Sequence, residues 1–293
     1  MNQAQSNAYS QDQKIEVSYW RRKLIVFGRV VLFVGTIVRF FATAFWISKT
    51  ESNVIHRRQR LAENVRDHAR FCLSVLGVDL KVSGVLPQGR FLMVANHMGF
   101  IDILFLASQI PMTFVTSVEM RDTPFLGWIT DMGGCLYVER RSRSSILREL
   151  EHIAQALKEG FRIVLYPESV STNGEQVLPF KRTLLMSAAM AGVPIQPVVV
   201  NFKSIDGEEF STLNRDSVCW YGSTPFVTAI LRTFETTSIE AEIEFLPMVR
   251  PTPETNRAEL ADTLHAMISS RFKPVKRIQP ELLDVADIQQ IKI

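Results

Sequence analysis

The sequence predicts an α/β protein whose mixed, largely parallel sheet is flanked by helices, preceded by an N-terminal helical segment that anchors it to a membrane. Two observations predict this. Short apolar runs alternate with amphipathic helical patterns from about residue 77 to residue 275. Before them, an apolar stretch carries many basic residues. With 293 residues, 46% of them hydrophobic, the chain is long enough to bury one sizeable core.

The sequence divides into four parts. We expect residues 1–20 to be disordered, residues 21–76 to form membrane-anchoring and connecting helices, residues 77–275 to form the α/β domain, and residues 276–293 to be a tail. The net charge of +3 is too small to favour a nucleic acid as partner. Ten of the lysines and arginines nevertheless lie in the first 60 residues, among apolar side chains, which suits an anionic membrane surface.

Residues 24–47 are the predicted anchor. Their length could cross a bilayer as one helix, but Arg29 and Arg39 interrupt the apolar run, and each would cost about 2.5–3.5 kcal/mol near the midplane. We therefore prefer an anchor that lies in one leaflet, as a helix pair broken near Gly35, while a single tilted span stays open. A signal peptide is disfavoured because bulky residues follow where a cleavage site should be.

The side of the membrane is predicted from the cysteines. Cys72, Cys135 and Cys219 are far apart and show no paired or metal-binding spacing. Basic residues flank both ends of the anchor, so they do not decide the orientation. A reducing environment, with the α/β domain on the cytoplasmic face, is the default expectation.

Apolar runs and helical periodicity place the elements of the domain. A connecting helix over residues 54–76 comes first. The predicted strands are residues 80–82, 91–95, 113–116, 135–138, 163–166, 195–201 and 242–246. The predicted helices are residues 103–109, 124–132, 144–159, 181–191 and 253–272.

Residues that can carry chemistry follow the strand at 91–95. His97 comes directly after this buried run and Asp102 five residues later. α/β proteins place their sites beyond the carboxyl ends of strands. An imidazole can take the proton of an attacking hydroxyl near neutral pH, and a carboxylate on its other nitrogen orients it and stabilises the imidazolium. The pair therefore predicts general-base catalysis without a covalent enzyme intermediate.

Two further clusters suggest anion binding. Arg140 ends the strand at 135–138, as either a clamp for a phosphate or carboxylate or a solvated basic turn. Glu168 ends the strand at 163–166. Lys181 and Arg182 open the helix expected at 181–191, where free backbone N–H groups favour an anion. No histidine or carboxylate cluster has the spacing of a metal site.

These pieces together resemble the glycerolipid acyltransferase family. Four ordered blocks between residues 91 and 200 carry the resemblance: Asn96, His97 and Asp102; Gly134 to Arg140; Tyr166, Pro167 and Glu168; and Val193, Pro194, Ile195, Pro197 and Val198. The resemblance implies an O-acyltransferase that uses acyl-CoA or acyl carrier protein as donor, a membrane lipid as acceptor and no cofactor. It makes His97 the base and Asp102 its orienting partner. The expected substrate-binding residues are Asn96, Arg140, Glu168, Lys181 and Arg182.

One departure from the family leaves the acceptor open. The third block usually ends in an arginine associated with the acceptor phosphate, and Ser171 stands there. We prefer 1-acylglycerol-3-phosphate, because Arg140 could supply the missing charge. A lyso-aminolipid such as lyso-ornithine lipid is the second candidate, because the run from Pro167 to Gly174 is similar to that of bacterial lyso-ornithine-lipid acyltransferases.

Two functions without acyl transfer to a lipid also stay open. One is a catalytically weak membrane-associated binding protein, which the intact pair of His97 and Asp102 disfavours. The second is a lipid hydrolase that delivers the acyl chain to water. The lack of a Gly-x-Ser-x-Gly elbow disfavours a serine hydrolase.

Overall fold

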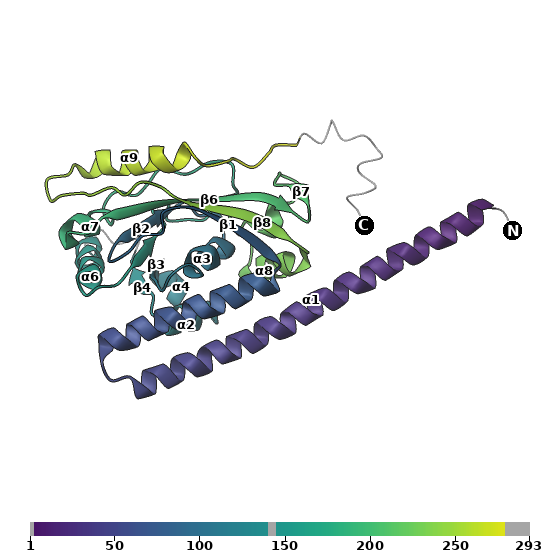
Figure 1. The fold of residues 1–293 in the computed structure, drawn as a ribbon, viewed down its shortest axis with the longest axis horizontal. Helices are drawn as coiled ribbons and strands as arrows, with labels where there is room; N and C mark the ends of the chain where they lie inside the picture. Colours follow the sequence, from purple (N-terminus) through teal and green to yellow (C-terminus); the bar gives the residue numbers. More distant parts are fainter. Residues whose placement is uncertain (1–2, 140–144, 279–293) are drawn as a thin grey trace.

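A single mixed sheet lies between two layers of helices (Figure 1). The computed structural model describes residues 3–139 and 145–278. The strand order is β1-β8-β6-β2-β5-β3-β4, with β7 paired to β6. β6 runs antiparallel to β7 and β8, and the other neighbouring strands are parallel. The predicted fold class is confirmed.

All seven predicted strands are present, and the short β7 is an addition. Their bounds are β1 Val78–Gly84, β2 Leu92–Ala95, β3 Thr113–Ser117, β4 Leu136–Val138, β5 Ile163–Leu165, β6 Ile195–Ile205, β7 Glu208–Glu209 and β8 Ile239–Phe245. β2 lies inside the sheet and all four of its residues are buried. Met93 and Ala95 pack into the core on one face of the sheet, whereas Leu92 and Val94 pack into the core on the other. A continuous apolar run is therefore what this position requires.

The helices are divided between the two faces. Their bounds are α1 Gln3–Thr50, α2 Val54–Val75, α3 Phe100–Ala107, α4 Val118–Arg121, α5 Leu126–Met132, α6 Ile146–Lys158, α7 Met186–Ala191, α8 Phe226–Glu235 and α9 Arg257–Ser269, with a 3₁₀ turn at Arg215–Ser217. Residues of α2 and α3 pack into the core that contains Met93 and Ala95. Residues of α6, α7 and α9 pack into the core on the opposite face, which contains Leu92 and Val94. α8 was not predicted.

Several helix boundaries differ from the prediction. α3 begins at Phe100, three residues early, which brings Asp102 into its first turn. α7 begins only at Met186, so the prediction that Lys181 and Arg182 open a helix is wrong. A proline stands at 179 and bends and turns occupy 182–185, so the chain reaches helical geometry late. α9 begins at Arg257 rather than residue 253, because Asn256 is its N-cap and accepts the Ala258 N–H at 2.8 Å.

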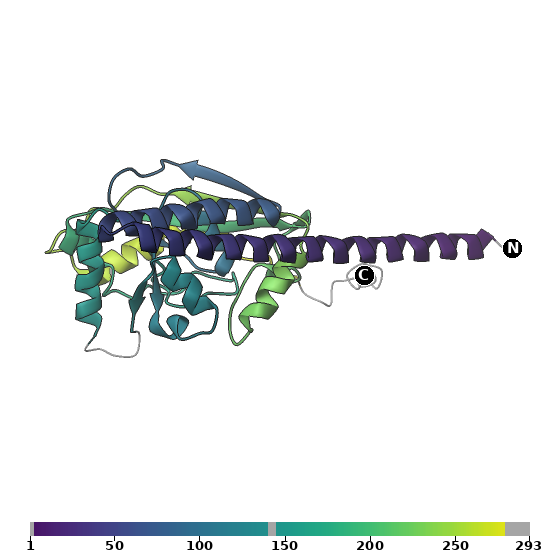
Figure 2. The same ribbon diagram turned by 90° about the horizontal axis from the view of Figure 1, so that it is seen from below.

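The N-terminal segment differs most from the prediction. α1 is one helix that continues through Gly35, so the prediction of a helix pair broken there is wrong. A glycine inside a helix costs about 0.5–1 kcal/mol, too little to break a long one. α1 also includes most of residues 1–20, which we expected to be disordered. The chain turns back only at residues 51–53, where Asn53 caps α2, so that α1 and α2 lie side by side (Figures 1 and 2).

Arg29 is buried, although it lies in the apolar stretch of α1. Its guanidinium donates to the carbonyls of Leu76, at the end of α2, and of Phe234 and Thr236, at the end of α8, with the distances to Leu76 and Phe234 both 3.1 Å. Helix C-termini leave such carbonyls without helical partners, and a cation there is favourable. Arg29 therefore joins α1 to the α/β domain. Arg39, ten residues later, is exposed.

The outer side of α1 is apolar. Within the described residues, one segment, Lys23–Thr50, is long and apolar enough to cross a membrane by length and composition. Its exposed large apolar side chains are Leu24, Phe27, Val31, Leu32, Val34, Val38, Phe45 and Trp46. The inner side packs on the domain through Phe33, whose ring meets that of Phe234 at 5.2 Å, and through the buried Ala44 and Ile47. α1 thus follows the domain with one side and leaves an apolar face outward.

Candidate active site

The site lies where two neighbouring parallel strands end. β2 and β5 pair with Val94 opposite Leu165. The residues that follow them, Asn96 and His97 after β2 and Tyr166 to Glu168 after β5, therefore meet at one edge of the sheet. The sequence placed both groups beyond the ends of apolar runs, and the structure shows that these two strands are neighbours.

His97 and Asp102 form the central pair. The imidazole Nδ1 lies 3.1 Å from Oδ2 of Asp102. The carboxylate is fully buried and also accepts the backbone N–H groups of Met98 at 2.6 Å and Gly99 at 3.2 Å. These donors fix its orientation, and its contact with Nδ1 assigns the proton of a neutral imidazole to that nitrogen. Nε2 is then left with its lone pair, and 17% of the His97 side chain is exposed.

Gly99 explains how this turn fits its surroundings. A Cβ there would lie 2.7 Å from the carbonyl oxygen of Val218 and 3.0 Å from the nitrogen of Trp220. Only a glycine lets the two backbones approach so closely. The Trp220 N–H accordingly donates to the Met98 carbonyl at 2.8 Å. The segment around Trp220 thereby supports the turn that holds His97.

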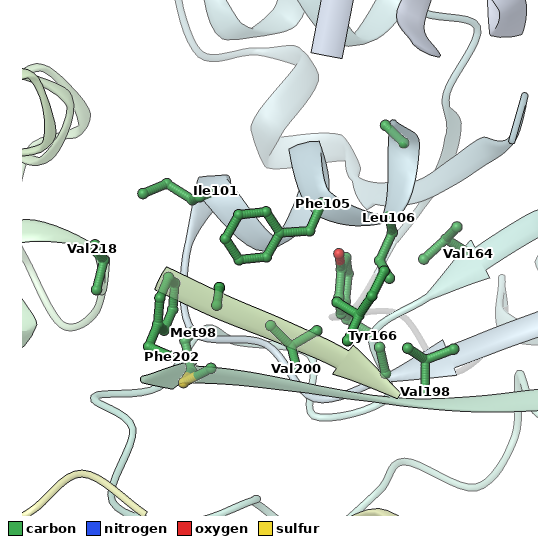
Figure 3. Packing of buried hydrophobic residues seen from close by; sticks show 14 of the residues in the cluster. Met98, Ile101, Phe105, Leu106, Val164, Tyr166, Val198, Val200, Phe202 and Val218 are labelled. Carbon is green, nitrogen blue, oxygen red and sulfur yellow. The ribbon is translucent and has the colours of Figure 1, made fainter. Parts of the chain in front are cut away.

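Tyr166 holds the imidazole from a third direction. Its ring stacks on that of His97 with centroids 4.1 Å apart and planes 18° apart. The hydroxyl group of Tyr166 is buried and has no hydrogen-bond partner among the described residues. Figure 3 shows the ring within the apolar core, close to Leu106 and Val164. Burial raises the pKa of Tyr166 well above its ordinary value, so the phenol stays protonated.

Glu168 faces the backbone of the site. Oε1 accepts the His97 N–H at 2.7 Å, and Oε2 accepts the Leu178 N–H at 2.6 Å. The carboxyl is buried, and burial raises its pKa to about 7, against the effect of these two hydrogen bonds. Thr172 adds its own N–H and hydroxyl to the His97 carbonyl, at 2.9 and 3.1 Å. This geometry makes Glu168 a positioning residue, and its predicted contact with the acceptor stays a prediction.

Asn96 turns away from the imidazole. Its side-chain amide donates to the Val200 carbonyl at 3.0 Å and its oxygen accepts the Val200 N–H at 2.8 Å. The side chain is buried between β2 and β6 and its amide hydrogen-bonds as a backbone peptide would. It therefore fixes the end of β2 in the sheet. The prediction that it binds substrate has no support in this geometry.

The described cationic side chains that the sequence predicted for the site do not lie beside His97 and Asp102. Lys181 and Arg182 have exposed side chains, and only the Lys181 backbone approaches the site, through its N–H to the Pro167 carbonyl at 2.8 Å. Arg140 lies outside the described residues. Ser171, in the place of the family's arginine, donates its hydroxyl to the Trp220 carbonyl. Among the described side chains, no group of three or more histidines, cysteines or carboxylates could hold a metal ion.

Sequence reasoning missed three supporting residues of the site: Gly99, Tyr166 as a stacking partner, and Thr172. Gly99 was visible in the sequence as a small residue directly after the polar turn. The others act through contacts to residues 69 to 75 positions away, for which a single sequence carries no signal.

Comparison with known proteins identifies the family. A family model described as Acyltransferase matches residues 78–201. The lyso-ornithine lipid O-acyltransferase of Pseudomonas aeruginosa is 34% identical over 174 residues, which cover 58% of this chain and 66% of that protein. The protein of the same name from Rhodobacter capsulatus is 30% identical over 206 residues, which cover 69% of this chain and 72% of that one.

Relatives with a phosphate-bearing acceptor in their names are more distant. The 1-acyl-sn-glycerol-3-phosphate acyltransferase of Neisseria meningitidis is 24% identical over 236 residues, which cover 78% of this chain and 90% of that one. The crystal structure of the 1-acyl-sn-glycerophosphate acyltransferase PlsC from Thermotoga maritima matches with a TM-score of 0.63 at 19% identity, covering 86% of this chain and 95% of that one. At this identity the structural match shows the fold.

Proposed function

The chain belongs to the glycerolipid acyltransferase family, and from that premise we propose that it transfers a fatty acyl group from acyl-CoA or acyl carrier protein to the hydroxyl of a lyso-aminolipid, with His97 as the general base. The observation that carries the mechanism is the 3.1 Å contact between His97 Nδ1 and a fully buried Asp102. This contact leaves Nε2 as the proton acceptor.

The reaction needs no covalent enzyme intermediate. As the acceptor oxygen attacks the thioester carbonyl carbon, Nε2 of His97 takes the hydroxyl proton. Asp102 stabilises the imidazolium that forms. When the tetrahedral intermediate collapses, the C–S bond breaks and the imidazolium returns its proton to the leaving sulfur. The products are the ester and the free thiol of the donor, and His97 is neutral again.

The acceptor is the point on which we depart from our sequence-based preference for 1-acylglycerol-3-phosphate. Ser171 is a hydrogen-bond donor to Trp220, not a cation, and the side chains of Lys181 and Arg182 are exposed. The relatives from Pseudomonas aeruginosa and Rhodobacter capsulatus, at 34% and 30% identity, carry the name lyso-ornithine lipid O-acyltransferase. These observations favour a lyso-aminolipid of the lyso-ornithine type. Lysophosphatidate is the second candidate, supported by the Neisseria relative.

The membrane contact is assigned to the outer face of α1. Because Arg29, Phe33 and Ile47 hold α1 along the domain, a helix that crossed the bilayer would pull the domain into it. We therefore propose that α1 lies in one leaflet with its apolar face toward lipid, on the cytoplasmic side. Val38→Glu on this face should lower the fraction that sediments with liposomes. Val82→Glu, an equally polar change at an exposed valine of β1, should not.

A panel of lysolipids tests the function. The purified protein in detergent is given acyl-CoA or acyl carrier protein with lyso-ornithine lipid or lysophosphatidate, and both ester product and free fatty acid are measured. We expect ester from lyso-ornithine lipid, and a loss of at least about 10²-fold in His97→Ala. Near-normal transfer by a folded His97→Ala would refute the mechanism. Free fatty acid without ester would indicate a hydrolase, and no turnover of any lipid would indicate a binding protein.

A further inference from the structure

We propose that a pocket between α1 and α2 binds an anionic phospholipid of the bilayer, with Arg39 against the lipid phosphate. The two helices lie side by side on the same side of the sheet (Figure 1). The pocket between them has a volume of about 350 Å³. Its walls include Leu32, Gly35 and Arg39 of α1 and Asp67, His68 and Phe71 of α2. The inference rests on the proposed contact of α1 with the membrane.

The pocket opens on the apolar outer face of α1. Leu32 and Val31, which also lines the pocket, are both exposed residues of that face. On the facing helix, the ring of Phe71 is exposed as well. These side chains offer apolar contact to the glycerol backbone and the first methylene groups of a lipid. A lipid in this pocket would therefore contact the apolar face of α1 and α2 at the same time.

Arg39 needs an anion at this position. It follows Arg29 by ten residues in the same apolar segment, but it forms no hydrogen bond or ion pair with another described residue. A cation beside a lipid layer is unfavourable unless an anion or water pairs with it. A guanidinium binds a phosphate through two parallel hydrogen bonds. A phospholipid is the source of phosphate that the membrane itself supplies.

The charge of the walls favours an anionic lipid over a zwitterionic one. Asp67 pairs with Arg66 at 2.8 Å, so its charge is compensated within α2. His68 Nδ1 lies 2.7 Å from the carbonyl oxygen of Asn64, which can only accept, so that nitrogen carries the proton. Burial lowers the pKa of His68, and the charge of Arg39 lowers it further, so the imidazole is neutral near pH 7. The described walls are thus left with the positive charge of Arg39.

The charge of α2 as a whole has the same sign. Its 22 residues include five arginines and two carboxylates. A helix with an excess of basic residues beside an apolar face suits an anionic leaflet, and the cytoplasmic leaflet is anionic. This is the leaflet to which we assign α1. The pocket adds a defined site to this diffuse attraction.

Two glycines of α1 allow a test that leaves every charge in place. Gly35 lines the pocket, and a Cβ on it would meet no atom within 4 Å, so Gly35→Phe should fill the pocket without straining the helix. Gly28 lies seven residues earlier on the same side of α1, outside the pocket lining, and its Cβ position is equally free. Gly28→Phe is therefore the control for the added apolar ring.

The measurement compares binding to vesicles of phosphatidylcholine alone with binding to vesicles of equal parts of phosphatidylcholine and phosphatidylglycerol. The ratio of the two binding constants gives the preference for anionic lipid. The unaltered protein and Gly28→Phe should prefer the anionic vesicles. Gly35→Phe and Arg39→Gln should each lower the preference about fivefold or more, the size expected for one basic residue near an anionic surface.

The outcomes separate this inference from the proposed membrane contact. If the unaltered protein binds neither vesicle, the membrane contact is wrong and the pocket assignment falls with it. If it binds both equally, the pocket assignment is wrong while the contact stands. Equal preferences in Gly35→Phe and Gly28→Phe would show a diffuse attraction and would also overturn the pocket.

A second pair of variants decides the question if Gly35→Phe lowers the melting temperature. Arg60 is an exposed arginine of α2 outside the pocket lining, so Arg60→Gln is the control for Arg39→Gln. A clearly larger loss of preference in Arg39→Gln supports the site. Equal losses in the two variants overturn it, because diffuse attraction depends on the number of charges and not on their place in the pocket.

Discussion

The protein buries charged side chains in two regions that are built in different ways. At the sheet edge, Asp102 is held by Nδ1 of His97 and by the N–H groups of Met98 and Gly99, all within five residues of it. In α1, Arg29 is held by carbonyls that lie 47 residues away in α2 and 205 to 207 residues away at the end of α8. The charge of Asp102 is satisfied by groups in its own turn. The charge of Arg29 is satisfied only when α1, α2 and α8 pack together.

This difference explains which charge could be interpreted from sequence. A turn that satisfies its own carboxylate recurs as a short motif, and the pair at 97 and 102 was recognised. From the sequence, Arg29 is a cation that interrupts an apolar anchor, and nothing near it in the chain marks a partner. The structure shows that Arg29 is buried and joins α1 to the domain, whereas Arg39 is exposed.

The largest effect is expected from Asp102→Asn, which keeps the size of the side chain and removes its charge. The amide cannot stabilise an imidazolium and can favour the wrong tautomer of His97. We expect kcat to fall by at least about 10²-fold with a small change in melting temperature, measured with a saturating thioester donor. Loss of folding with normal activity in the folded fraction would make Asp102 a structural residue like Arg29.

Arg29→Met should show the reverse pattern. The change keeps an apolar stem and leaves carbonyls at two helix ends without their donor, at a cost of about 1.5–3 kcal/mol for even one charge-assisted hydrogen bond. We expect a clear drop in the melting temperature in detergent and little change in kcat for the folded protein. Arg39→Met, in the same helix and exposed, is the matched control and should change stability by less than about 0.5 kcal/mol. Equal effects of the two would show that the clamp contributes nothing.

Glu168→Gln tests an intermediate case. Glu168 lies at the active site, as Asp102 does, but its partner His97 is 71 residues away in the chain. Both carboxylate oxygens accept an N–H, so either orientation of an amide places its NH₂ group against a donor. We expect activity to fall roughly tenfold, through displacement of His97 or of the loop at Leu178. Full activity would mean that the hydrogen bonds of Asp102 are enough to hold the turn at residues 97–102 without Glu168.

The pH dependence of stability gives a separate test of Glu168. Its folded pKa, about 7, is raised above the usual value, so folding favours the protonated form. The stability that this protonation provides is fully present below the ordinary carboxyl pKa and is lost as the pH rises through about 7. The melting temperature of the unaltered protein relative to that of Glu168→Gln should therefore fall between about pH 5 and pH 8. A difference that stays constant with pH would contradict the raised pKa.

The smallest effect is expected from Tyr166→Phe. This change removes a buried hydroxyl group that has no hydrogen-bond partner among the described residues, and it keeps the ring that stacks on His97. Stability should rise by up to about 1 kcal/mol, and kcat should not change. Tyr166→Leu removes the stacked ring and should therefore lower kcat. A loss of activity in Tyr166→Phe would show that the phenol takes part in the site.

The sequence by itself determined the elements whose signal is local. Apolar runs located the seven main strands. In β2 and β5 the reason is burial on both faces, which requires apolar residues throughout, whereas β1 is largely exposed. The placement of His97, Asp102 and Glu168 beyond strand ends followed from the same runs. The resemblance over residues 91–200 indicated the family.

Tertiary structure alone decided the contacts that join distant parts of the chain. It turned Asn96 toward Val200, bound Ser171 to Trp220, left the side chains of Lys181 and Arg182 exposed, and buried Arg29. The physical reason is the same in each case. A polar side chain takes whichever complementary group folding brings within about 3 Å of it, and for partners 49 to 207 residues apart that group is set by how helices and strands pack, not by the neighbouring sequence.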